Sequence, residues 1–121
     1  MAAPTKTATA LTGLGATAPG VTNSSQWVNC TTYFEMVAAL NATWSGTTTS
    51  GPTVTINVSP DNGTTVYVLA ILQGPPGSSP WNVPPIEVPD AAMYVQVQCK
   101  NTDTTITVTF AGHVTHIDTV A

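Results

Sequence analysis

The chain has 121 residues, about the length of one ordinary domain. Only 7% of them are charged, with two lysines, no arginine and a net charge of −4, whereas an average domain carries roughly 25% charged residues. Two lysines cannot neutralise a run of phosphates, so we expect no nucleic-acid partner; no basic segment or long apolar run points to a membrane. The hydrophobic fraction of 42% is enough to build a core.

The first residues, 1–26, are expected to form an extended N-terminal arm. Small and polar side chains alternate at its start, and glycine and proline then interrupt any regular element. Between Met1 and Val21, the only large apolar residues are Leu11 and Leu14. This segment cannot bury enough surface to fold alone, but it can pair as a strand where an edge is offered. It lacks the apolar stretch of a secretory signal peptide, so we expect no signal peptide.

A strand pattern begins after residue 26. Between residues 28 and 40 the apolar side chains occupy one parity, which is the period of a strand with one buried face. Alanine, methionine and leucine in the second half also favour a helix, but the neighbouring pattern favours a strand. The side chains expected to point inward are Val28, Cys30, Thr32, Phe34, Met36, Ala38 and Leu40.

Short strands and turns alternate along the rest of the chain. Pro60 to Gly63 predicts a tight hairpin, because proline presets φ and Asn-Gly readily adopts positive φ. Residues 73–85 contain five of the ten prolines and are expected to form a long loop that includes Trp81. The expected strands are 53–59, 65–72, 92–99, 104–110 and 112–120, with Val54, Ile56, Val58, Met93, Val95, Val97, Cys99, Ile106, Val108 and Phe110 pointing inward.

Seven or eight strands with turns between them indicate an all-β antiparallel sandwich. Residues 27–121 are expected to form this single domain, preceded by the arm. Cys30 and Cys99 are far apart in the chain and do not have the spacing of a metal motif. We expect two buried thiols, with a disulfide as the alternative.

The candidate catalytic residues are few. His113 and His116 lie three positions apart, which places them on opposite faces of a strand, so they cannot bind one metal together unless the strand contains a bulge. Asp61, Asp90 and Asp103 each fall in a predicted turn, where aspartate is expected for backbone reasons. The sequence contains no nucleophile elbow and no phosphate loop. We therefore expect no enzyme, no metal and no cofactor.

Aromatic residues offer a second kind of site. Trp81 in the expected proline-rich loop, or alternatively Trp44, could stack on a sugar ring in a glycan-binding module. The alternative, which we favour, is that these rings pack down as plugs at the end of the sandwich. The candidate aromatic set is Trp27, Tyr33, Trp44, Tyr67, Trp81 and Tyr94.

The overall character of the chain suits a subunit of a large particle. A charge-poor, threonine-rich surface has few long side chains to immobilise, which lowers the entropic cost of packing against a partner. Three segments also resemble the small β-sandwich structural proteins of tailed bacteriophages. Those proteins combine a hairpin of the pattern V-S-x-D-G, a strand of the pattern V-P-x-x-x-Y-V-x-V and a closing strand rich in threonine and valine. The three segments are Val58–Thr64, Val88–Val97 and Thr104–Val108, and the resemblance spans about residues 28–110.

This family includes capsid decoration, or cement, proteins, which are commonly jelly-roll-like trimers on the capsid lattice. The resemblance therefore implies a jelly-roll-like homotrimer that binds the major capsid protein on the outside of a phage head and bridges capsid subunits. Such a virion protein is made in the host bacterial cytoplasm and has no catalytic role.

The arm, through Thr7, Thr9, Leu11 and Leu14, is expected to reach the capsid or a neighbouring chain. Two alternatives stay open. One is another virion module of a tail, neck or head fibre, and the other is a glycan-binding module centred on Trp81 or Trp44.

Overall fold

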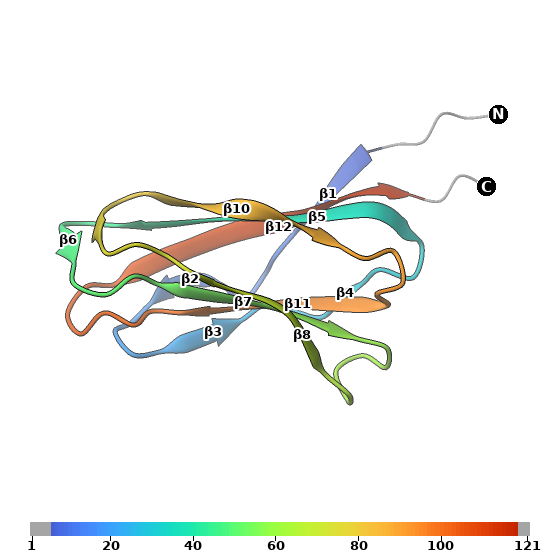
Figure 1. The fold of residues 1–121 in the computed structure, drawn as a ribbon, viewed down its shortest axis with the longest axis horizontal. Coiled ribbons are helices and arrows are strands. Elements are labelled where there is room, and N and C mark those ends of the chain that lie inside the picture. Colours follow the sequence, from blue (N-terminus) through green and yellow to red (C-terminus); the bar gives the residue numbers. More distant parts are fainter. Residues whose placement is uncertain (1–5, 119–121) are drawn as a thin grey trace.

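The computed structural model describes residues 6–118 and shows two antiparallel sheets packed face to face (Figure 1). The predicted all-β sandwich is confirmed, while its jelly-roll classification stays a prediction. The first sheet has the order β1-β12-β5-β10, with β2 also paired to β12; the second has the order β3-β11-β7-β8, with β4 also paired to β11. A separate two-stranded pairing joins β6 to β9.

The strands of the first sheet are β1 (Lys6–Ala10), β2 (Gly15–Thr17), β5 (Tyr33–Trp44), β10 (Trp81–Val88) and β12 (Val108–Asp118). Those of the second are β3 (Thr22–Ser24), β4 (Val28–Asn29), β7 (Thr53–Ser59), β8 (Tyr67–Gln73) and β11 (Tyr94–Lys100). The short pair consists of β6 (Thr47–Thr48) and β9 (Gly77–Ser78).

The core forms between the inner faces of the two sheets. On β11 the alternation is complete, because Val95, Val97 and Cys99 are fully buried while Gln96 and Gln98 lie on the other face. Apolar residues at every second position of a strand bury one face, which is why the predicted parity holds there. The same pattern places Met36, Ala38, Leu40, Ala42, Val54, Ile56, Val108, Phe110 and Val114 in the core.

A bulge at the start of β5 reverses the predicted side-chain direction. Glu35 has a positive φ of 48°, and the register between β5 and β12 shifts between Thr115 and Ile117. Two residues of β5 therefore oppose one residue of β12, so the parity before the bulge is inverted. Phe34, predicted to point inward, is 47% exposed, and Thr32 is exposed as well.

Two other side chains that were predicted to point inward, those of Met93 and Ile106, do not, because both residues lie outside the strands. Met93 precedes β11 and is 42% exposed, since it lies in the turn rather than on the pleated face. Ile106 precedes β12, which begins only at Val108, and is half-buried. Val58 is half-buried and packs against the core.

The proline-rich segment is not one long loop. Its second half is β10, which pairs with β5 from Trp81 to Val88. The consecutive prolines Pro84 and Pro85 fall where the register shifts between Val83 and Ile86. Since β10 is an edge strand, its missing proline N–H groups remove no ladder bond from a further strand.

The N-terminal segment forms outer strands of its own sandwich, whereas the sequence predicts a separate arm. β1 pairs with β12 from Lys6 to Ala10, and β3 pairs with β11. Leu11 is buried in the core, and its N–H donates to the carbonyl of Gly112 at 2.9 Å. The chain itself thus offers the edges that this segment needs. Residues 1–5 of the predicted arm lie outside the described residues.

Candidate functional site

The two sheets have four edges, formed by β1 with β2, by β10, by β3 with β4, and by β8, and these edges differ in how well they are protected. β10 carries a double proline and a register shift, β1 carries Lys6 among small residues, and β3 is the polar sequence Thr-Asn-Ser. Proline, lysine and bulges are the features that keep an edge strand from pairing with another chain. β8, with the sequence Tyr-Val-Leu-Ala-Ile-Leu-Gln, has no charge and no proline, and its one protecting feature is a register shift against β7 between Ile56 and Asn57.

β8 exposes large apolar side chains while remaining attached to the core. Leu69 and Leu72 pack against the core cluster. Tyr67, Val68 and Ile71 are 61%, 58% and 66% exposed. Figure 1 shows the β7–β8 hairpin projecting from one end of the second sheet. Apolar side chains of this size gathered on one edge strand mark an interaction surface. We call β8 with the preceding Val66 the β8 edge.

The segment of the chain that contains the β8 edge is uncharged. No charged residue lies between Asp61 and Glu87. A hollow of about 280 Å³ adjoins Tyr67 and is lined by Pro60, Pro89 and the exposed Met93, among others. The β8 edge and this hollow together form the site that we regard as functional.

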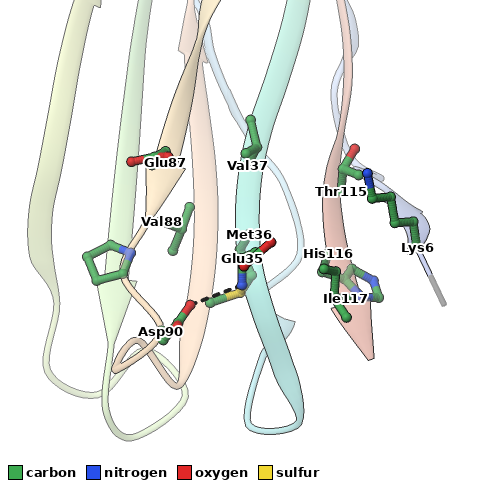
Figure 2. A pocket seen from close by; sticks show the side chains of 11 residues that line it. Lys6, Glu35, Met36, Val37, Glu87, Val88, Asp90, Thr115, His116 and Ile117 are labelled. Atoms are coloured by element: carbon green, nitrogen blue, oxygen red, sulfur yellow. Dashed lines mark hydrogen bonds between the residues drawn. The ribbon is translucent and has the colours of Figure 1, made fainter. Parts of the chain in front are cut away.

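A second hollow, of about 760 Å³, lies among β5, β10 and β12 and includes several ionisable groups. Figure 2 shows Asp90 beside the backbone of Glu35, where the Asp90 carboxylate accepts the Glu35 N–H at 3.0 Å, and shows Glu87 pointing away. Within residues 6–118, no group of three or more His, Cys, Asp or Glu side chains could hold a metal ion. The hollow thus presents separate carboxylates rather than a converging set.

The two histidines lie on opposite faces of β12, as predicted: His113 is exposed and His116 is buried. The His116 ring stacks on Tyr33, with centroids 3.5 Å apart and planes inclined by 6°. Its Nδ1 lies 3.1 Å from the Thr7 hydroxyl and its Nε2 lies 3.0 Å from the Thr9 hydroxyl. His116 therefore fastens β1 to the first sheet.

The predicted arm residues face their own chain. Thr7 and Thr9 bind His116, Leu11 is buried, and Leu14 packs partly buried against the core. The structure thus brings these four side chains onto the sandwich rather than onto a projecting arm.

The two tryptophans proposed for sugar stacking are half-buried and pack against the core. The Trp44 Nε1–H donates to the carbonyl of Gly77 at 2.9 Å. Trp81 lies so close to Gly74 that a Cβ there would come within 2.6 Å of the ring. Both rings therefore pack against their own chain, and the glycan-binding alternative stays a prediction.

Val68 and Ile71 were not predicted as site residues. A strand was predicted at residues 65–72, but no cover was assigned to its two faces. The available signal is that this run is apolar at both parities, although it follows a tight hairpin and precedes a proline-rich segment. A strand that is apolar on both faces needs a cover on both.

Cys30 and Cys99 are both free and buried, so the thiol prediction is confirmed and the disulfide alternative is wrong. Burial raises the pKa of Cys30 to about 11, against a smaller opposing effect of a backbone hydrogen bond, and raises the pKa of Cys99 to about 12. The thiolate is the reactive form, and both groups stay protonated at neutral pH.

We expect both cysteines to resist thiol labelling in the folded protein. Ellman's reagent at pH 8 should release almost no colour from the native chain and close to two equivalents in denaturing urea. Rapid labelling of the native chain at either position would contradict the burial seen here.

The described residues contain no helix long and apolar enough to cross a membrane. Comparison of the chain with protein-family models, with curated proteins and with solved structures finds no match.

Proposed function

We propose that this chain is a structural subunit that assembles with copies of itself and onto the outside of a phage head, without catalysis. The observation that supports this most is the β8 edge, an uncharged apolar edge strand with Val68 and Ile71 largely exposed. An edge of this kind aggregates unless a partner covers it.

The surface composition supports the same role. With 7% charged residues and two lysines, the chain exposes few long side chains that binding would immobilise. Each immobilised flexible side chain costs roughly 0.5–1.5 kcal/mol, so a threonine-rich surface makes many contacts at low entropic cost. This favours the large, repeated interfaces of a lattice.

The choice of a phage head as the lattice rests on the sequence resemblance described above. The partner proposed is the major capsid protein, and the effect proposed is stabilisation of the shell by bridging neighbouring capsid subunits. The homotrimer implied by the same resemblance stays a prediction.

The test uses purified heads of the phage that encodes the chain, stripped of this protein and mixed with increasing amounts of it before pelleting. We expect the chain to pellet with the heads, to saturate at a fixed ratio to the major capsid protein, and to raise the temperature at which heads release DNA. A chain that stays in the supernatant at all concentrations would overturn the proposal. Binding to purified tails instead of heads would overturn the head assignment and support the tail or neck alternative.

A further inference from the structure

We propose that the β8 edge pairs antiparallel with the β8 edge of a second copy of this chain, which joins the second sheets of two copies into one continuous sheet. This pairing concerns the same surface as the proposed function. It rests on the proposed function only in assuming that the chain assembles with other chains.

The backbone of β8 has room for one more strand. It pairs with β7 on one side, from Tyr67 to Gln73, and no second strand of the described chain pairs with it. The outer N–H and C=O groups of such a strand are a template for another extended segment. Of the other three edges, one has the two prolines of β10, one has Lys6 of β1, and one is formed by the polar β3 and the two-residue β4. β8 shares with β10 only a register shift, which lies between Ile56 and Asn57 of its ladder with β7, so β8 is the edge least protected against pairing.

The side chains on β8 favour an uncharged partner strand. Val68 pairs with Asn57 and Ile71 pairs with Thr55 across the β7 ladder, and both Val68 and Ile71 are exposed on the outside of the second sheet. A partner strand that places a charge beside these side chains gains no apolar contact there and finds no opposite charge on β8 to pair with. A second β8 carries none.

The charges around β8 select the antiparallel arrangement. Asp61, in the turn before β8, is the nearest acid on that side in sequence. Parallel pairing would place the two Asp61 carboxylates at the same end. Antiparallel pairing separates them by the length of the strand or more, about 24 Å for seven residues and well beyond the Debye length of about 8 Å. It also closes by two-fold symmetry, so that each copy makes the same contact.

This pairing has a consequence for the number of copies. A two-fold contact between identical edges joins chains in pairs, and no third copy can enter the same contact. The inference therefore predicts two chains, or a multiple of two, in place of the three implied by the resemblance.

The test compares the unmodified chain with Ile71→Lys and with Val21→Lys as the matched control, by light scattering coupled to size exclusion at about 100 µM. Both variants add one positive charge at an exposed apolar position, but Val21 lies before β3, at the opposite edge of the second sheet. We expect two chains for the unmodified protein and for Val21→Lys, and one chain for Ile71→Lys. Circular dichroism should show the same strand content in all three, because Ile71 is 66% exposed.

If Ile71→Lys fails to fold, Val68→Lys gives the same comparison at the neighbouring exposed position of β8. Spin labels on Ile71→Cys and, separately, on Asn62→Cys test the direction, since both native cysteines are buried. Antiparallel pairing predicts a short distance between the labels at position 71 and a long one between those at position 62. Two short distances would overturn it.

A mass of one or three chains for the unmodified protein, or two chains for Ile71→Lys, would overturn the pairing. If such a protein still saturates phage heads, the pairing alone fails and the proposed function stands. If a two-chain protein does not bind heads, the head assignment fails and the pairing stands.

Discussion

Replacing Gly51 with alanine is expected to destabilise the fold by about 3 kcal/mol or more, a large part of the roughly 5–15 kcal/mol that stabilises a domain. Gly51 lies just before β7, where the chain touches the segment that leaves β8. A Cβ at this position would overlap the carbonyl group of Gly74 and come within 2.9 Å of the Pro75 carbonyl carbon. These are backbone atoms, so no side-chain rotation relieves the overlap.

The hydrogen bonds at this crossing leave little freedom for the backbone to separate. The Gly74 N–H donates to the Pro52 carbonyl at 2.7 Å, and the Gln73 side-chain amide donates to the Gly51 carbonyl at 2.6 Å. Separating the two segments to admit a methyl group would break both bonds. It would also loosen the end of β8 that pairs with β7.

Gly20→Ala is the matched control for Gly51→Ala. Gly20 has a positive φ of 77° but nothing within 4 Å of an added Cβ, so alanine there incurs only backbone strain of about 1 kcal/mol. Urea unfolding of both variants measures the difference. Equal losses of unfolding free energy in the two variants would contradict the close approach of Gly51 to Gly74.

Replacing Asp103 is expected to give the second large effect, because this buried carboxylate joins separate parts of the chain. Its Oδ1 accepts the N–H of Thr49 at 2.9 Å, and its Oδ2 accepts the N–H groups of Thr105 and Ile106 at 3.0 and 2.9 Å. The neighbouring buried Asn101 donates to the carbonyl of Ile106 in the same loop at 2.7 Å. Asp103→Ala leaves three backbone donors without this acceptor, so we expect the melting temperature to fall by roughly 10 °C or more.

The charge of Asp103 makes this contribution dependent on pH. Backbone hydrogen bonds from Thr105, Thr49 and Ile106 hold the pKa of the Asp103 carboxyl well below its usual range. A folded-state pKa below the unfolded value means that the group stabilises the fold above the ordinary aspartate pKa of about 4. That stability is lost progressively as the pH falls below about 4 towards the lower folded-state pKa.

The Asp103→Asn variant separates charge from shape. We expect it to be less stable than the unmodified chain at pH 7, because its amide nitrogen cannot accept a backbone N–H. We also expect its melting temperature to fall less between pH 5 and pH 3. The control is Asp90→Asn, an exposed carboxylate that accepts one backbone bond. An acid dependence unchanged by Asp103→Asn would contradict the assignment.

Periodicity alone predicted much of the core. β11 and the second half of β5 bury alternate apolar residues, from Met36 to Leu40 and from Val95 to Cys99, and both were predicted with the correct inward face. The failure at Phe34 has a local cause that no alternation reveals. Glu35 adopts a positive φ, which is uncommon outside glycine and asparagine, and the bulge it makes inverts the strand.

The remaining differences depend on which strands become neighbours. Pro84 and Pro85 are compatible with β10 only because it is an edge strand, and its position in the sheet is a tertiary property. In the same way, the weakly apolar start of the chain becomes β1 because β12 has an open edge and His116 binds Thr7 and Thr9. The run from 65 to 72 is apolar at both parities, which indicates that both faces need a cover, but the exposure of Val68 and Ile71 follows from β8 being outermost, which is a tertiary property.

The central claim is that the β8 edge is covered when the chain assembles, and amide hydrogen exchange tests it most directly. The exchange of residues 66–73 is measured at about 1 µM and about 200 µM, with the proline-interrupted edge strand β10 as the internal reference. We expect the β8 edge to exchange more slowly at the higher concentration, while the exchange of β10 does not change. Equal exchange of the β8 edge at both concentrations, in a chain that light scattering shows to be a monomer throughout, would contradict it.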